Sequence, residues 1–188
     1  MTTGKRRPGR PRTLHRQDIL AAAVALIDDE GLQALTTRRL GTALGVTAMS
    51  LYRHFPNREA LLADVVDCLA ATVEFAPADG WTAMLRAFAE GYRAMLLRHP
   101  HAVALLATHP LHPGRGRDLV APLLTGFAAA GIGDERAVTI VQSVAVFTLG
   151  HALAQVGGEP PDPATTPYYD AWYEAGLGAM IHGFSIRQ

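Results

Sequence analysis

The chain has 188 residues, 49% of them hydrophobic, and its 17 basic and 17 acidic side chains give no net charge. A chain of this size and apolar content can bury a full core but does not support more than one large domain or two small ones, and we expect one small and one medium domain. The first residues lack an apolar run of signal-peptide length. No run of about 18 uninterrupted apolar residues follows, so we expect a cytoplasmic protein. The single cysteine, Cys68, is expected in the core.

The charges are distributed unevenly along the chain. Residues 1–62 carry ten basic and five acidic side chains, whereas residues 63–188 carry seven and twelve. A basic first third beside an acidic remainder indicates that only the first part meets phosphate groups.

The first 13 residues are predicted to be a disordered basic arm, because the sequence KRRPGRPR is too rich in Pro and Gly to form a helix. The arm contains Gly9-Arg10-Pro11, which resembles the core of an AT-hook. In such a motif Arg10 would lie in the narrow minor groove of A·T-rich DNA. A basic tail that only contacts phosphates is the alternative.

Residues 16–30 are predicted to form a support helix that ends at Gly31, and residues 36–55 have the pattern of a helix-turn-helix. Thr36 or Thr37 can cap the first helix of this unit, and Gly45 suits the left-handed stop of a tight turn. Thr47 can cap the second helix, predicted over residues 48–55, and Asn57 can cap a third that runs to about residue 75.

The second of these helices is expected to read DNA. Leu51 and Phe55 lie four residues apart and must face inward, which leaves an exposed face for the major groove. The residues that we predict to contact DNA from this unit are Thr47, Ala48, Met49, Ser50, Tyr52, Arg53 and His54. Arg38 and Arg58 flank it and would hold phosphates or neighbouring bases.

Residues 35–62 resemble the TetR family of one-component bacterial transcriptional regulators. The matching segments are Leu35-Thr36-Thr37-Arg38, Leu44-Gly45-Val46, Leu51-Tyr52-Arg53-His54-Phe55 and Asn57-Arg58-Glu59-Ala60-Leu61-Leu62. The resemblance implies an all-α fold with a helix-turn-helix DNA-binding domain, residues 14–62, and an effector-binding and dimerisation domain, residues 63–188. It also implies a homodimeric repressor that leaves a palindromic operator when a small molecule binds.

The second domain is predicted to contain helices over residues 81–98, 101–108, 118–130 and 134–156, and a last helix from Thr166 or Pro167 to about residue 184. Residues 109–116 are predicted as a loop, and residues 157–163 as a mobile connection. Many small side chains occur in the last two helices, and the resemblance implies that these helices form a four-helix dimer interface.

The second domain also resembles the tetracycline repressor subgroup, at residues 81–98, Thr108-His109-Pro110 and Phe147-Thr148-Leu149-Gly150. The resemblance implies an effector pocket, lined by Phe88, Tyr92, Leu105, Thr108, His109, Phe127, Phe147 and His151. In that subgroup an imidazole and a carboxylate contact a magnesium–drug complex, but Leu105 and Ala154 stand at those positions here. We therefore expect an apolar or aromatic effector, with no metal ion and no cofactor.

Some sequence features are compatible with other functions. Four histidines, His99, His101, His109 and His112, lie within fourteen residues and suggest a metal-responsive regulator as an alternative, although no acid or cysteine lies between them. A constitutive architectural protein that binds DNA through its basic arm is a second alternative. An enzyme is not expected, because no Gly-rich phosphate loop, nucleophile elbow or HExxH motif occurs.

Overall fold

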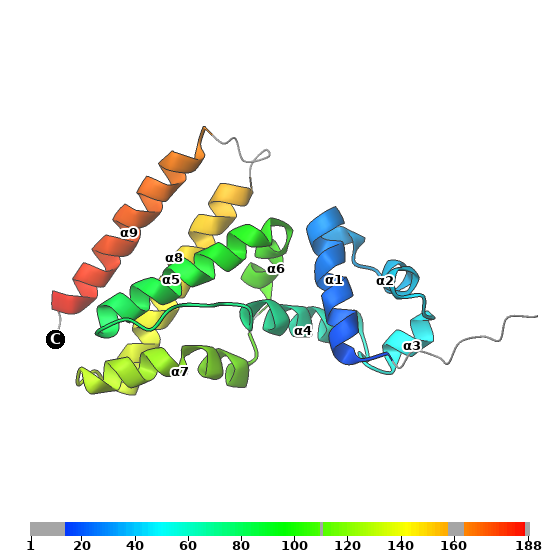
Figure 1. The fold of residues 1–188 in the computed structure, drawn as a ribbon, viewed down its shortest axis with the longest axis horizontal. Helices are drawn as coiled ribbons and strands as arrows, with labels where there is room; N and C mark the ends of the chain where they lie inside the picture. The colour runs from blue at the N-terminus through cyan, green and yellow to red at the C-terminus, as the bar shows by residue number, and fades with distance from the viewer. Residues whose placement is uncertain (1–13, 110, 158–163, 187–188) are drawn as a thin grey trace, which may run out of the picture.

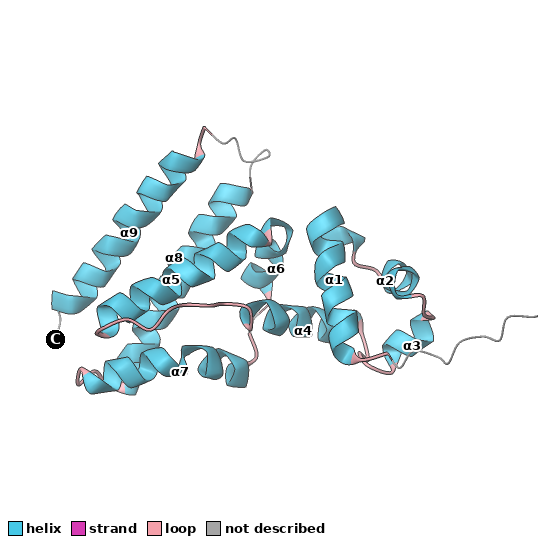
Figure 2. Cartoon of the chain, viewed as in Figure 1, coloured by secondary structure: helices cyan, strands magenta, loops and turns pink. Residues whose placement is uncertain are grey.

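The computed structural model describes residues 14–109, 111–157 and 164–186, and these ranges contain helices joined by turns, with no strand (Figures 1 and 2). The predicted all-α class is therefore confirmed. The α-helices are α1 (Arg16–Glu30), α2 (Thr37–Leu44), α3 (Ala48–Tyr52), α4 (Arg58–Ala70), α5 (Trp81–Arg98), α6 (Val103–Thr108), α7 (Pro113–Ala129), α8 (Asp134–Val156) and α9 (Thr166–Ile186). Two 3₁₀ turns, η1 (Leu32–Ala34) and η2 (Pro100–Ala102), lie between them.

The first three helices form one end of the molecule, and α4 leads from them into the rest of the chain (Figure 1). α1 buries Ile19, Ala23 and Ile27, which recur every four residues and so lie on one face. That face packs against α2 and α4. The predicted boundary after residue 62 falls inside α4, which is continuous from Arg58 to Ala70.

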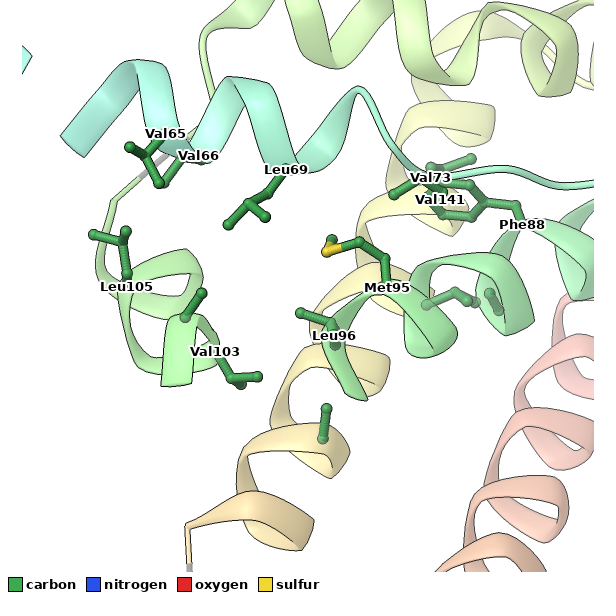
Figure 3. Packing of buried hydrophobic residues seen from close by; sticks show 14 of the residues in the cluster. Val65, Val66, Leu69, Val73, Phe88, Met95, Leu96, Val103, Leu105 and Val141 are labelled. Atoms are coloured by element: carbon green, nitrogen blue, oxygen red, sulfur yellow. The ribbon is translucent and has the colours of Figure 1, made fainter. Parts of the chain in front are cut away.

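The other end of the molecule is built around α5 and α8, which cross each other, with α6, α7 and α9 packed around them (Figure 1). Figure 3 shows Val65, Val66 and Leu69 of α4 facing side chains of α5 and α6. The apolar core is therefore continuous from the first three helices into the second half of the chain.

Among the described helices, α8 is long and apolar enough by length and composition to cross a membrane, with a mean hydropathy of 1.6. A search for uninterrupted apolar residues misses this helix, because Gln142 and Ser143 interrupt its apolar sequence. The helix packs against α5, α6, α7 and α9, and 39% of its most apolar stretch is buried.

Three predicted helix bounds are wrong. α3 ends at Tyr52 instead of residue 55, because the amides of His54 and Phe55 both bond to the carbonyl of Leu51 and close the chain into a turn. α4 ends at Ala70, five residues early. α7 begins at Pro113, inside the predicted 109–116 loop, since proline suits the first turn of a helix.

Candidate nucleic-acid interface and effector pocket

The turn between α2 and α3 is fixed by contacts between neighbouring residues. The Thr36 hydroxyl accepts a hydrogen bond from the Arg39 amide at 3.2 Å, so Thr36 is the cap of α2. Gly45 adopts the predicted left-handed conformation at φ 66°. Gly41, which the sequence did not single out, lies so near the turn that a Cβ there would meet the Val46 carbonyl oxygen at 2.9 Å. A glycine at this position therefore allows α2 to approach the turn.

The exposed face of α3 carries the side chains that were predicted to read DNA. Met49 is 73% exposed and Tyr52 49% exposed, whereas Leu51 and Phe55 are only 2% and 4% exposed. This arrangement confirms the predicted inward and outward faces. The Met49 and Tyr52 side chains are therefore free to contact a partner molecule.

Ser50 of α3 and the polar residues that flank the helix form a short chain of hydrogen bonds. Thr47 occupies the cap position, but its hydroxyl lies 3.1 Å from the Ser50 hydroxyl and does not accept from a backbone amide, so its predicted capping role is wrong. Arg53 donates from Nη2 to the same Ser50 oxygen at 3.5 Å. These contacts hold Arg53 along the surface of α3, beside Ser50.

The flanking residues lie around the same surface. An open hollow of about 650 Å³ is lined by Thr37, Arg38, Gly41, Thr42, Gly45, Val46, Thr47 and Ala48. A smaller hollow of about 50 Å³ includes Tyr52 and Arg58, which places the start of α4 next to α3. His54 is half-buried. The structure thus brings together all the predicted DNA contacts except Arg10, which lies outside the described residues.

Arg16, a basic residue at the start of α1, makes its contacts within the protein and is still partly exposed. Its guanidinium pairs with Asp64 of α4 at 2.5 Å, donates to the carbonyl of His54 and lies 4.3 Å from the centre of the Phe55 ring. Arg16 therefore joins α1 to α4 and to the end of the helix-turn-helix.

The residues that were predicted to line the effector pocket fall into separate groups. Phe88 and Tyr92 of α5 stack with ring centres 6.1 Å apart, and burial raises the pKa of Tyr92 to about 12. Phe127 packs against Trp81 at 5.1 Å. Leu105 is fully buried in α6.

Thr108 and His109 lie at the end of α6, next to α4. The Thr108 hydroxyl donates to the carbonyl of Ala104 at 2.9 Å. Nε2 of His109 lies 3.2 Å from a carboxylate oxygen of Glu59. This end of the predicted pocket therefore contacts the helix that carries Arg58.

Phe147 and His151 belong to an aromatic cluster between α8 and α9. His151 is 3% exposed, and neither of its ring nitrogens meets the geometry of a hydrogen bond among the described residues, although the nearby Tyr169 backbone acts to raise its pKa. Burial, followed by the nearby charge of Arg93, lowers the pKa of His151 below its ordinary value. Its ring lies 4.8 Å from Trp172 and 5.1 Å from Tyr173. Buried imidazole nitrogens without partners are uncommon in proteins and mark a candidate polar contact for a ligand.

Tyr173 organises this cluster, although no sequence pattern indicates this role. Its hydroxyl lies 3.0 Å from the Thr148 hydroxyl and donates to the carbonyl of Ala89 at 3.0 Å. Burial raises its pKa. Arg93 lies 4.7 Å over the ring and bonds to Gln155 and Asp170. One tyrosine thus joins α5, α8 and α9.

The four clustered histidines do not converge on one point. His99 faces Asp28, and His101 faces backbone carbonyls of α1. His109 faces Glu59, while Nδ1 of His112 accepts from the Gly114 amide and caps α7. Within the described ranges, no group of three His, Cys, Asp or Glu side chains could hold a metal ion. The arrangement therefore gives no support to the metal-responsive alternative.

Two family models match the chain. Residues 19–65 match "Bacterial regulatory proteins, tetR family", and residues 76–166 match "Tetracyclin repressor-like, C-terminal domain". Together they cover more than half of the chain.

Characterised relatives agree with these matches. The chain is 32% identical over 159 residues to the HTH-type transcriptional repressor DrrR1 of Streptomyces coeruleorubidus, covering 82% of this chain but only 58% of DrrR1. It is 31% identical over 147 residues to the class E tetracycline repressor protein of Escherichia coli, covering 76% of this chain and 69% of that protein.

Solved structures share the whole fold. A TetR variant from Acinetobacter baumannii in complex with minocycline superposes with a TM-score of 0.81 at 26% identity, covering 92% of this chain and 97% of that one. BioQ bound to its double-stranded DNA operator superposes with a TM-score of 0.75 at 26% identity, covering 93% and 100%. This chain, a transcriptional regulator and not an enzyme, belongs to the TetR family.

Proposed function

We propose that this regulator is a repressor that binds a palindromic operator as a homodimer and releases it when a small apolar or aromatic molecule binds. The observation that carries the proposal is the face of α3, where Met49 and Tyr52 are exposed beside Ser50 and Arg53. Side chains of this kind contact base edges and thymine methyl groups in the major groove. Because its target is DNA, the protein would act in the cytoplasm.

The surface of α8 and α9 supports a dimer. Three of the exposed large apolar side chains lie on α8 and three on α9, namely Val138, Val146, Leu153, Tyr168, Trp172 and Ile186. Gly150 and Gly183 have open space beside them, so a second copy could approach closely. Two-fold pairing through these helices would present two copies of α3 to successive major grooves, about 34–36 Å apart. By contrast, Gly176 already faces the Phe147 ring of its own chain and serves packing within one subunit.

The proposed effector follows from the side chains between the helices of the second domain. Phe88, Tyr92, Phe127 and Phe147 supply aromatic walls, while Thr108, His109 and His151 supply polar contacts. Leu105 and Ala154 have no side-chain atom that could ligate a metal ion. A mixture of aromatic walls with a few polar groups suits a drug-sized organic molecule.

The operator test is selection of bound sequences from random DNA, followed by affinity measurement. We expect a short palindrome, and we expect Tyr52→Ala or Arg53→Ala to weaken its binding by about 1–3 kcal/mol with little change on random DNA. Arg115→Ala, on α7, is the matched control. Equal weakening on both DNAs would contradict base reading by α3, and enrichment only of A·T-rich DNA without a palindrome would favour an architectural protein.

The effector test is calorimetric titration of the full chain with tetracycline, with and without magnesium. We expect no binding in either case, since Leu105 and Ala154 replace the metal-contacting positions of the tetracycline repressors. Micromolar binding that disappears on chelation of magnesium would overturn the metal-free effector.

A further inference from the structure

The last turn of α1 is electrostatically unusual. It contains Asp28, Asp29 and Glu30 and no basic residue. The carbonyl groups at the end of a helix carry partial negative charge, so carboxylates there destabilise the helix unless donors or cations lie close by. Arg39 of α2 pairs with Glu30. The groups that face Asp28 come from the other half of the chain.

Two histidines at the corner between α5 and α6 supply those groups. Nδ1 of His99 lies 3.0 and 2.9 Å from the two carboxylate oxygens of Asp28. Nδ1 of His101 lies 3.2 and 2.9 Å from the carbonyl oxygens of Ile27 and Asp28. Carboxylates and carbonyls only accept, so both Nδ1 atoms act as donors.

The backbone holds these two side chains in position. His99 precedes Pro100, which disfavours a helical conformation, and at φ −121° and ψ 59° it ends α5. The η2 turn follows, and Ala102 and Val103 are buried at 1% and 0% exposure. The histidines are therefore presented to α1 by an anchored corner.

The contact is also sheltered from solvent. The side chains of His99 and Asp28 are 14% and 29% exposed, whereas those of His109 and Glu59, the other His–carboxylate pair across the two halves, are 26% and 71% exposed. Interactions between exposed groups contribute little to stability, so the contact at His99 is the stronger candidate for holding the halves together.

We infer that His99 and His101 cap α1 across the domain boundary and so set the angle at which the helix-turn-helix is held. The opposite end of α1 is tied to α4 by Arg16 and Asp64, at 2.5 Å. α1 is thus clamped between α4 and the α5–α6 corner, and a movement of that corner shifts α1 together with α2. The cap itself is inferred from these contacts and does not depend on the protein's function. Its effect on operator binding rests on the proposed function.

Hydrogen exchange of the full chain, followed by mass spectrometry, tests the cap. In His99→Ala and His101→Ala we expect the amides of residues 27–31 to exchange at least about 10-fold faster, with α8 unchanged. His182→Ala, an exposed histidine of α9, is the matched control. Unchanged rates at the end of α1, or a uniform rise throughout the chain, would overturn the cap.

A double-mutant cycle isolates the contact between the two side chains. Asp28→Ala combined with His99→Ala should raise exchange no further than the stronger single change, since both remove the same interaction. His99→Asn keeps a donor near the position of Nδ1 and should restore part of the protection. Additive effects would show that the two side chains act independently, against the inference.

Operator affinity tests the consequence. We expect His99→Ala to change affinity for the selected operator by at least about fivefold, with His182→Ala unchanged. Faster exchange at α1 with unaltered operator affinity would remove the regulatory role and leave only a structural cap. If the unmodified chain binds no operator, the proposed function fails, but the exchange results still decide whether the cap exists.

Discussion

The contacts that stabilise each half of the molecule differ in their range along the sequence. In the helix-turn-helix, Thr36 bonds to Arg39 and Asn57 bonds to Ala60, each three residues away. In the second domain, the Tyr173 hydroxyl bonds to residues 25 and 84 positions away. Short-range contacts give a helix-turn-helix that can be recognised from one stretch of sequence, whereas long-range contacts depend on the whole fold.

The largest expected effect is at Gly91 of α5, where the segment after α4 passes against α5 at Glu74. A Cβ at this position would lie 2.1 Å from the Glu74 carbonyl oxygen, so the backbone must move. We expect Gly91→Ala to lower the free energy of unfolding by about 3 kcal/mol or more, measured by urea unfolding. In Gly126→Ala, the new methyl group meets only Met84 at 3.6 Å, and stability should not fall. Equal stability of the two variants would contradict the crossing of α5 by the segment at Glu74.

The next effect is at Tyr173. Tyr173→Phe leaves Thr148 and the Ala89 carbonyl without their buried partner, and we expect a loss of about 1–3 kcal/mol in thermal or urea unfolding. Tyr168→Phe, at an exposed tyrosine of α9, is the matched control and should be neutral. An unchanged free energy of unfolding in Tyr173→Phe would show that these long-range hydrogen bonds do not stabilise the second half of the chain.

A smaller effect is expected from the local caps of the DNA-binding end. Thr36→Ala and Asn57→Ala should each cost about 1 kcal/mol of unfolding free energy, because each frees a helix amide. Thr37→Ala tests the neighbouring threonine, which does not cap α2. A larger loss in Thr37→Ala than in Thr36→Ala would contradict the assignment of the cap.

The smallest effect is the pH dependence that His151 confers. Burial lowers its pKa, so the unfolded chain binds a proton at a higher pH than the folded chain does. The free energy that the neutral, buried His151 contributes to folding is therefore fully present above the ordinary histidine pKa. This contribution should be lost as the pH falls from that value toward the lower pKa of the folded chain. Between about pH 7.5 and about pH 5.5, the melting temperature of His151→Leu should fall less than that of the unmodified chain. His182→Leu should behave like the unmodified chain. An undiminished drop in His151→Leu would exclude His151 as the source.

Most of the correct predictions concern short-range features of the DNA-binding end. The faces of α3, the stop at Gly45 and the caps at Thr36 and Asn57 were all predicted, because each depends on residues a few positions apart. The start of α7 was missed, since a run containing two histidines, Pro113 and two glycines is typical of a loop. The DNA contacts and the pocket lining stay predictions.

The sequence by itself determined the all-α class, the family and which face of α3 is exposed, because helical periodicity and capping are encoded in short segments. Only the tertiary structure decided that His99 and His101 meet the end of α1, and that Tyr173 joins three helices. Their partners lie 25 to 84 residues away along the chain. No local pattern specifies such partners, because they are brought together by the packing of the apolar core.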